Sequence, residues 1–180
     1  EQQRAADDLR VERKNVEMAL AFMSRREQAL KSRLIVRSSR GERAAPSGPI
    51  PVVTDFTCPV RGPLAFSDSW GAPRSGGRRH AGTDIMNPTG TENVAVVSGS
   101  FETHRSAAGG LTIYLHGDDG HTYYYAHLSQ IVGPDRRVAQ GEVIGRTGST
   151  GNARAPHTHF EFHPNGGRAV SSYRLLRAHC

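Results

Sequence analysis

Residues 156–164 have the sequence PHTHFEFHP, in which three histidines fall within seven positions. The polar members of this stretch share one parity: His157, His159, Glu161 and His163. Side chains of a β-strand alternate between its two faces, so the spacing predicts a strand with these residues on one face. The intervening threonine and phenylalanines would face the core. A row of imidazoles on the polar face indicates metal binding or acid–base chemistry.

The sequence after residue 51 is typical of a mainly β domain. Short runs rich in β-branched and aromatic residues are separated by Gly, Asp and Asn turns, at spacings of roughly 8–15 residues. This pattern predicts a mostly antiparallel β-sheet or β-sandwich, with a short helix in SSYRLLRA (171–178). The predicted strands include NVAVVSG (93–99), LTIYLHG (111–117), TYYYAHL (122–128) and EVIGRTG (142–148).

The N-terminal part of the chain has a different composition. Residues 1–37 contain no glycine or proline and carry interspersed charges, which predicts a long amphipathic helix. Apolar residues one heptad apart give it a coiled-coil-like seam: Leu9, Val16, Met23 and Leu30. Such a helix could lie on its own domain or bind a partner, including a second copy. Residues 38–51, SSRGERAAPSGPIP, are typical of a linker. We therefore expect a helix (1–37), a linker (38–51) and a β domain (52–180).

The charge of the chain favours an anionic partner without identifying one. The 180 residues carry a formal net charge of +6, and scattered basic residues without a recognition motif argue against nucleic acid. A cell-wall polymer remains a suitable partner. The only lysines are Lys14 and Lys31, an arginine bias that points to a high-GC bacterium. The longest apolar run, MALAFM (18–23), is too short to cross a bilayer, although a membrane anchor upstream of Glu1 is compatible with the sequence.

Two cysteines, Cys58 and Cys180, bracket the histidine-rich region. A disulfide between them would close a loop of more than a hundred residues and would suit an oxidising, extracytoplasmic compartment. Two unrelated buried thiols are the alternative.

Candidate functional residues lie in three separate segments. HAGTD (80–84) contributes His80 and Asp84, YAHLS (125–129) contributes His127, and the stretch at 156–164 contributes its histidines. Two histidines and one carboxylate form a common catalytic zinc set, with a fourth position left open. Spacing alone does not distinguish this set from hydrogen-bonded histidines without a metal.

Taken in order, HAGTD (80–84), YAHLS (125–129) and GSTGNARAPHTHFEF (148–162) resemble the lysostaphin- or LytM-type zinc metallopeptidases, which cut peptides in bacterial peptidoglycan. The resemblance covers about residues 58–180. It implies one Zn²⁺ per chain, bound by His80, Asp84 and His159. It implies that His127 and His157 are catalytic and do not bind the metal. One departure is Thr158, which stands where the family usually has leucine and is expected to weaken core packing.

The resemblance predicts a zinc-dependent endopeptidase acting on peptidoglycan outside the cytoplasm, secreted or in the cell envelope. The alternative is a non-catalytic envelope regulator whose helix recruits or activates another hydrolase. All five key positions are filled, which favours the enzyme. Two interpretations of Glu161 stay open, a partner of a ligand imidazole or a surface carboxylate, and His163 is expected at the surface. The remaining histidines are expected to have no role in the site: His104, His116, His121 and His179.

Overall fold

The structure, a computed structural model, describes residue 53 and residues 55–180, which belong to a compact unit spanning Val52–Cys180. The predicted helix (1–37) and linker (38–51) lie outside the described residues, and both stay predictions. Within the described part of the chain, no helix has the length and apolar character needed to cross a membrane.

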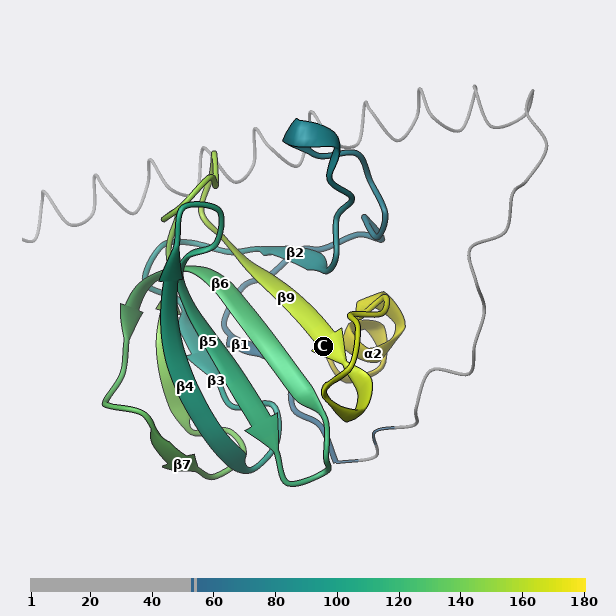
Figure 1. The fold of residues 1–180 in the computed structure, drawn as a ribbon. Coiled ribbons are helices and arrows are strands. Elements are labelled where there is room, and N and C mark those ends of the chain that lie inside the picture. Colours follow the sequence, from purple (N-terminus) through teal and green to yellow (C-terminus); the bar gives the residue numbers. More distant parts are fainter. Residues whose placement is uncertain (1–52, 54) are drawn as a thin grey trace, which may run out of the picture. The chain divides into compact units, whose positions relative to one another are not determined.

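The described residues form a nine-stranded sheet in which every strand pair is antiparallel (Figure 1). The mainly β, antiparallel prediction is therefore confirmed, as one continuous hydrogen-bonded sheet. The strands are β1 (Val60–Arg61), β2 (Thr83–Met86), β3 (Glu92–Val94), β4 (Gly99–Ser106), β5 (Gly110–Gly117), β6 (Thr122–Ile131), β7 (Arg136–Val138), β8 (Val143–Thr147) and β9 (His157–His163). Two 3₁₀ turns, η1 (Ser75–Gly77) and η2 (Pro164–Gly166), and one helix, α2 (Tyr173–His179), complete the unit.

The long strand β6 organises the sheet. The hydrogen-bonded order is β1-β3-β8-β6-β5-β4-β7, and β9 joins β6 on one side and β2 on the other. The first half of β6, Thr122–Ala126, pairs with β9, whereas the part from Leu128 onward pairs with β8. The change of partner occurs at residue 127. One candidate catalytic residue thus lies at the branch point of the sheet.

Aromatic residues fill the core on one face of β6 and β9. Tyr123, Tyr125, Phe160 and Phe162 have no measurable solvent exposure, as the alternating pattern of both strands predicts. The Tyr125 hydroxyl remains paired, since it donates to the Val94 carbonyl at 3.0 Å. Because the phenylalanines hold one face of β9 in this core, the histidines and Glu161 on its other face are held in a defined orientation.

The segment 93–99 differs from the prediction of a single strand. Strand β3 ends at Val94, and Ala95, Val96 and Val97 are buried without belonging to a strand. Their backbone groups bind irregular partners: Thr57 N–H donates to the Val96 carbonyl at 2.9 Å, and Gly141 N–H donates to the Ala95 carbonyl at 2.8 Å. A short apolar run signals burial, but burial alone does not require a strand.

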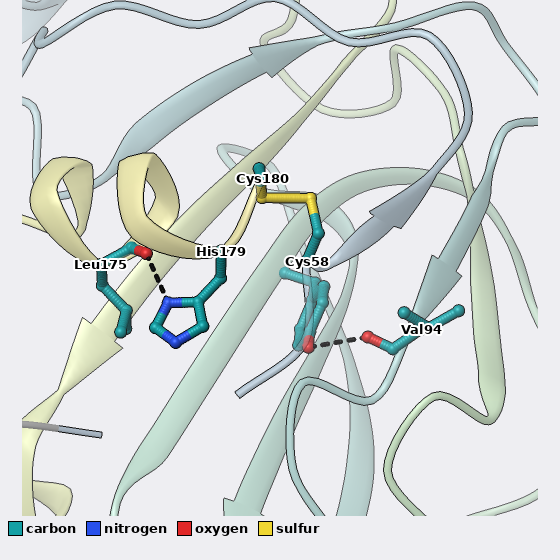
Figure 2. Close-up of a disulfide and its surroundings, with 6 residues drawn as sticks. Cys58, Val94, Leu175, His179 and Cys180 are labelled. Atoms are coloured by element: carbon teal, nitrogen blue, oxygen red, sulfur yellow. Dashed lines mark hydrogen bonds between the residues drawn. A yellow bond between two sulfur atoms is a disulfide. The ribbon is translucent and has the colours of Figure 1, made fainter. Parts of the chain in front are cut away.

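Helix α2 covers the end of β9 and is joined to the start of the domain by a disulfide. Figure 2 shows the bond between Cys58 and Cys180, whose Cα atoms are 5.1 Å apart. At the other end of the helix, the buried Ser172 hydroxyl lies 2.8 Å from that of Thr83 on β2. The predicted disulfide and the predicted short helix are both present, and Ser172, just before the helix, contacts both β2 and the Phe160 carbonyl of β9.

Candidate metal centre and catalytic histidines

Strands β2 and β9 bring the first and third segments together. Their antiparallel register places Asp84 directly opposite His159. The approach is close at Gly82, where an added Cβ would lie 2.4 Å from the Phe160 carbonyl oxygen and 2.9 Å from the His159 ring. Only glycine fits there without a shift of the backbone, which explains the glycine in HAGTD. The alternating burial of β9 confirms that its histidines and Glu161 share one face.

Three electron-pair donors meet at this pairing. Oδ1 of Asp84 lies 2.9 Å from Nε2 of His80 and 2.9 Å from Nδ1 of His159, and these two nitrogens are 2.9 Å apart. His80 and Asp84 are buried, and His159 is nearly so. Within the described residues, this is the group of His, Cys, Asp and Glu side chains that could hold a metal ion.

In each ring, the nitrogen that points away from the cluster, called here the outer nitrogen, has a hydrogen-bond partner that determines the tautomer. Nδ1 of His80 faces the Ser69 carbonyl at 2.9 Å, and Nε2 of His159 faces Oε1 of Glu161 at 2.8 Å. Both partners accept hydrogen bonds, so these outer nitrogens carry the protons and the inner nitrogens of the neutral rings carry lone pairs. Two lone pairs and a carboxylate oxygen at such short range repel one another unless a cation lies among them.

The donor set fits zinc. Two imidazole nitrogens and one carboxylate oxygen are a common catalytic zinc set, and bonds of about 2.0–2.1 Å in a tetrahedron require donor atoms roughly 3.3 Å apart. The observed separations of 2.9 Å need only a small expansion to reach that value. Asp84 lies on β2, His159 lies on β9, and His80 lies in the loop before β2. Three protein ligands of this kind leave a fourth position of the tetrahedron for a ligand from solvent.

The pKa values of Asp84 and His159 also favour a cation at this position. Burial favours the neutral form of Asp84, but the His159 and His80 rings against its carboxylate outweigh burial, so the pKa of Asp84 lies far below the ordinary value. Burial also opposes a charge on His159, yet its hydrogen bonds to Asp84 and Glu161 raise its pKa to about 9. Without a metal the site therefore holds a proton on this imidazole. A divalent cation would replace that proton.

His127 comes from the second segment and takes an unusual backbone conformation. Its φ is +66°, in the left-handed region that residues other than glycine seldom adopt. Between the pairs Ile113–Tyr125 and Leu111–Leu128, β6 has one more residue than β5, which is a β-bulge. The bulge turns the imidazole toward β9, where its centroid lies 4.7 Å from that of His157.

The glycine-rich turn before β9 orients the His127 ring. Nδ1 of His127 donates to the Thr150 carbonyl at 2.8 Å, and the Thr150 hydroxyl donates to the Leu128 carbonyl at 2.8 Å. Gly151, at φ +73°, passes so close to the 108–110 segment that an added Cβ would lie 2.4 Å from the Gly110 nitrogen. The turn thus fixes the tautomer of His127 with a lone pair on Nε2.

His157 is arranged in the same way. Its Nδ1 donates to the Ala155 carbonyl at 2.8 Å, and its Nε2 lies 3.7 Å from Oδ1 of Asp84. Burial lowers the pKa of His157, and burial followed by the charge of His157 lowers the pKa of His127 to about 4. Both rings are therefore neutral near pH 7, with lone pairs beside the candidate metal centre.

Glu161 and His163 extend the site outward. Glu161 accepts from His159 through Oε1 and from Nε2 of His163 through Oε2, each at 2.8 Å. Burial raises the pKa of Glu161, but the hydrogen bonds from both histidines lower it to about 2. The interpretation of Glu161 as a partner of a ligand imidazole is thus supported. His163 is outside the candidate metal-binding group, as expected, and its side chain is partly exposed, at 20%, but it also holds this carboxylate.

Thr158, which was expected to weaken core packing, has its polar group paired. Its side chain is fully buried, and its hydroxyl donates to Oδ1 of Asn93 at 2.9 Å and lies 2.9 Å from the Thr147 hydroxyl. Asn93 in turn donates to the Thr147 hydroxyl at 2.9 Å. A closed network of paired polar groups replaces the apolar contact behind His157 and His159.

An antiparallel sheet that brings a His–Asp–His cluster next to two neutral imidazoles is the arrangement of a metallopeptidase. The model of Peptidase family M23 matches residues 78–171, more than half of the chain, and this range contains all five candidate residues. The chain belongs to Peptidase family M23. The resemblance to lysostaphin-type metallopeptidases is thereby confirmed.

Individual relatives differ in the bond named in their descriptions. The DD-carboxypeptidase/endopeptidase Mpg of Neisseria meningitidis is 37% identical over 91 residues, 49% of this chain and 21% of its own length. The glycyl-glycine endopeptidase ALE-1 of Staphylococcus capitis is 38% identical over 89 residues, 47% of this chain and 25% of its own length. The chain thus matches only about a fifth to a quarter of these proteins.

Among solved structures, the catalytic domain of lysostaphin from Staphylococcus simulans superimposes with a TM-score of 0.56 at 33% identity. The match covers 63% of this chain and 92% of that domain.

Proposed function

We propose that this protein is a zinc-dependent endopeptidase that hydrolyses peptide bonds of bacterial peptidoglycan. The observation that carries the proposal is the convergence of His80, Asp84 and His159 on one point, with their lone pairs facing inward. We assign one Zn²⁺ per chain to these three ligands. When bound, zinc supplies Lewis acidity that polarises a carbonyl group and lowers the pKa of water toward neutrality.

The proposed roles of His127 and His157 follow from their protonation. Each ring is held by a backbone carbonyl on Nδ1 and presents Nε2 to the site. A neutral imidazole can accept a proton from the attacking water and then donate it to the leaving amine. The centroids of the two rings are 4.7 Å apart. The rings can therefore divide two tasks between them: the proton transfer and the stabilisation of the negative charge on the carbonyl oxygen.

The proposed location is outside the cytoplasm, in the envelope or secreted. The disulfide between Cys58 and Cys180 supports an oxidising compartment. A further relative, the peptidoglycan DD-endopeptidase ShyC of Vibrio cholerae, is 35% identical over 91 residues and supports peptidoglycan as the substrate. The net charge of +6 favours adsorption to an anionic wall.

The test combines metal analysis with digestion of purified peptidoglycan. We expect about one zinc per chain and release of soluble peptides, with loss of release after treatment with a chelator and recovery after addition of zinc. A chain that binds zinc but releases no peptide would support the regulatory alternative and contradict the proposal. A chain that binds no zinc would contradict the metal assignment itself.

A further inference from the structure

A side chain outside the range matched by the family model reaches the candidate metal centre. Arg74 lies on the 71–80 loop, whose two sides are joined by hydrogen bonds from His80 N–H to the Ala72 carbonyl and from Arg74 N–H to the Arg78 carbonyl, both 2.9 Å. These bonds join the two sides of the loop, so the backbone of Arg74 is held near His80, a candidate ligand. The guanidinium is therefore held beside the site by the backbone of the loop.

The guanidinium uses one of its donors within the site. Nη2 of Arg74 donates to Oδ2 of Asp84 at 2.5 Å, while Oδ1 of the same carboxylate faces the imidazoles. Among the described residues, no other side chain or carbonyl accepts a hydrogen bond from this guanidinium. The side chain is 39% exposed, so its remaining donors face solvent next to the cluster. Such a planar fork suits a carboxylate.

The charge balance favours an anion here. Asp84 is the carboxylate that faces both the metal position and Arg74, and one carboxylate cannot neutralise a divalent cation and a guanidinium together. The neighbouring His127 and His157 each pair through Nδ1 with a backbone carbonyl, and an imidazole supplies no anion for the guanidinium. Glu161 is already paired with His159 and His163. The mouth of the site thus has uncompensated positive charge.

We propose that Arg74 binds a free carboxylate of the substrate on a residue that flanks the scissile bond, and that it thereby selects the bond that is cut. This inference rests on the proposed function and specifies its substrate. A cross-link in which the residue that supplies the amine keeps a free α-carboxylate meets this requirement. A bond between two glycines inside a bridge does not, because neither flanking residue has a free carboxylate.

The test uses the zinc-loaded full chain and two matched substrates. These are cross-linked stem-peptide dimers with the free carboxylate on the amine-side residue, and the same dimers with that group converted to a carboxamide. We expect the wild type to cleave the carboxylate form with a kcat/KM at least about 10-fold higher, the factor that a charge-assisted hydrogen bond supplies. In Arg74→Gln, the ratio of kcat/KM for the carboxylate dimer to kcat/KM for the carboxamide dimer is expected to lie within about twofold of one, because kcat/KM falls for the carboxylate dimer.

Arg79→Gln is the matched control, because it removes a charge from the same loop. Arg79 donates to the Gly71 carbonyl at 3.2 Å, whereas Arg74 donates to Asp84, so the loss of Arg79 should keep the carboxylate preference. A readout independent of turnover is the binding of D-alanine and D-alaninamide to the zinc-loaded chain, followed by NMR. The wild type should bind the carboxylate about 10-fold more tightly than the amide, and Arg74→Gln should not.

Equal kcat/KM for the two dimers in the wild type would overturn the inference, as would a carboxylate preference that persists in Arg74→Gln. Loss of zinc in Arg74→Gln, with equal loss on both substrates, would also overturn it, because Arg74 would then serve only to hold Asp84. If the zinc-loaded wild type cleaves neither the dimers nor pentaglycine, the proposed function fails. The NMR binding experiment then still decides the role of Arg74.

Discussion

The carboxylate of Glu161 accepts a hydrogen bond of 2.8 Å from Nε2 of His159, on the side of the ring opposite to Asp84. This contact fixes the tautomer that leaves the Nδ1 lone pair available for a metal. Loss of such an outer partner typically weakens metal affinity by about 10- to 100-fold. We therefore predict this loss for Glu161→Ala, measured by competition with a chromophoric chelator.

Glu161→Gln is expected to lose much less affinity, because its amide oxygen can still accept from His159. Glu102→Ala is the control, since it removes an exposed carboxylate on β4 that pairs with His116 on β5 at 3.0 Å. Zinc affinity of Glu161→Ala equal to that of the wild type would show that Glu161 does not orient the ligand.

The proposed division between ligands and catalytic groups predicts different effects for two histidine variants. His159→Ala removes a metal ligand and should abolish stoichiometric zinc uptake. His127→Asn should keep zinc and lose turnover by about 100-fold or more, because a proton-transfer group is lost. Asparagine is preferred over alanine here because it tolerates the positive φ of +66°. Zinc content by atomic emission, together with kcat, tests both variants. Full zinc in both would contradict the assignment of ligands.

The pKa of His127 predicts its protonation as pH falls. Burial, followed by the charge of His157, lowers this pKa to about 4 from an ordinary value of 6.5. The folded state therefore binds this proton less readily than the unfolded state does. Its contribution to stability is complete above about pH 6.5 and is lost as pH falls toward 4. Ring ¹⁵N chemical shifts of the metal-free chain should show a neutral His127 at pH 5.5. A midpoint near 6.5 would contradict the predicted burial effect.

The local part of the site could be predicted because strand periodicity is a local property. The even spacing of His157, His159 and Glu161 specified a shared face before any partner strand was known. The contact of Asp84 with His159 spans 75 positions, and no periodicity predicts it. The contact was predicted only because the three motifs occur in the order found in a known family. The spacing within each motif contains no information about contacts between motifs.

Several features could not have been predicted because they have no side-chain signature. The carbonyls that fix the rings belong to Ser69, Thr150 and Ala155, and any residue supplies a carbonyl. The bulge at His127 depends on pairing with two other strands. Arg74 was one basic residue among 23, and only the loop that carries it places it against Asp84. For His163, the alternation shared with Glu161 was the available signal.

The disulfide gives a last prediction, about stability. The Cys58–Cys180 bond spans 122 positions and joins the segment before β1 to the end of α2 (Figure 2). A loop of this length restricts the unfolded chain, so its loss should cost about 2–5 kcal/mol of unfolding free energy. Urea unfolding of Cys58→Ser/Cys180→Ser against the wild type measures this difference. Addition of dithiothreitol should destabilise the wild type by a similar amount and leave the double variant unchanged. Equal midpoints for the oxidised wild type and the double variant would mean that α2 is held by its packing alone, through Leu175, Leu176 and Ser172.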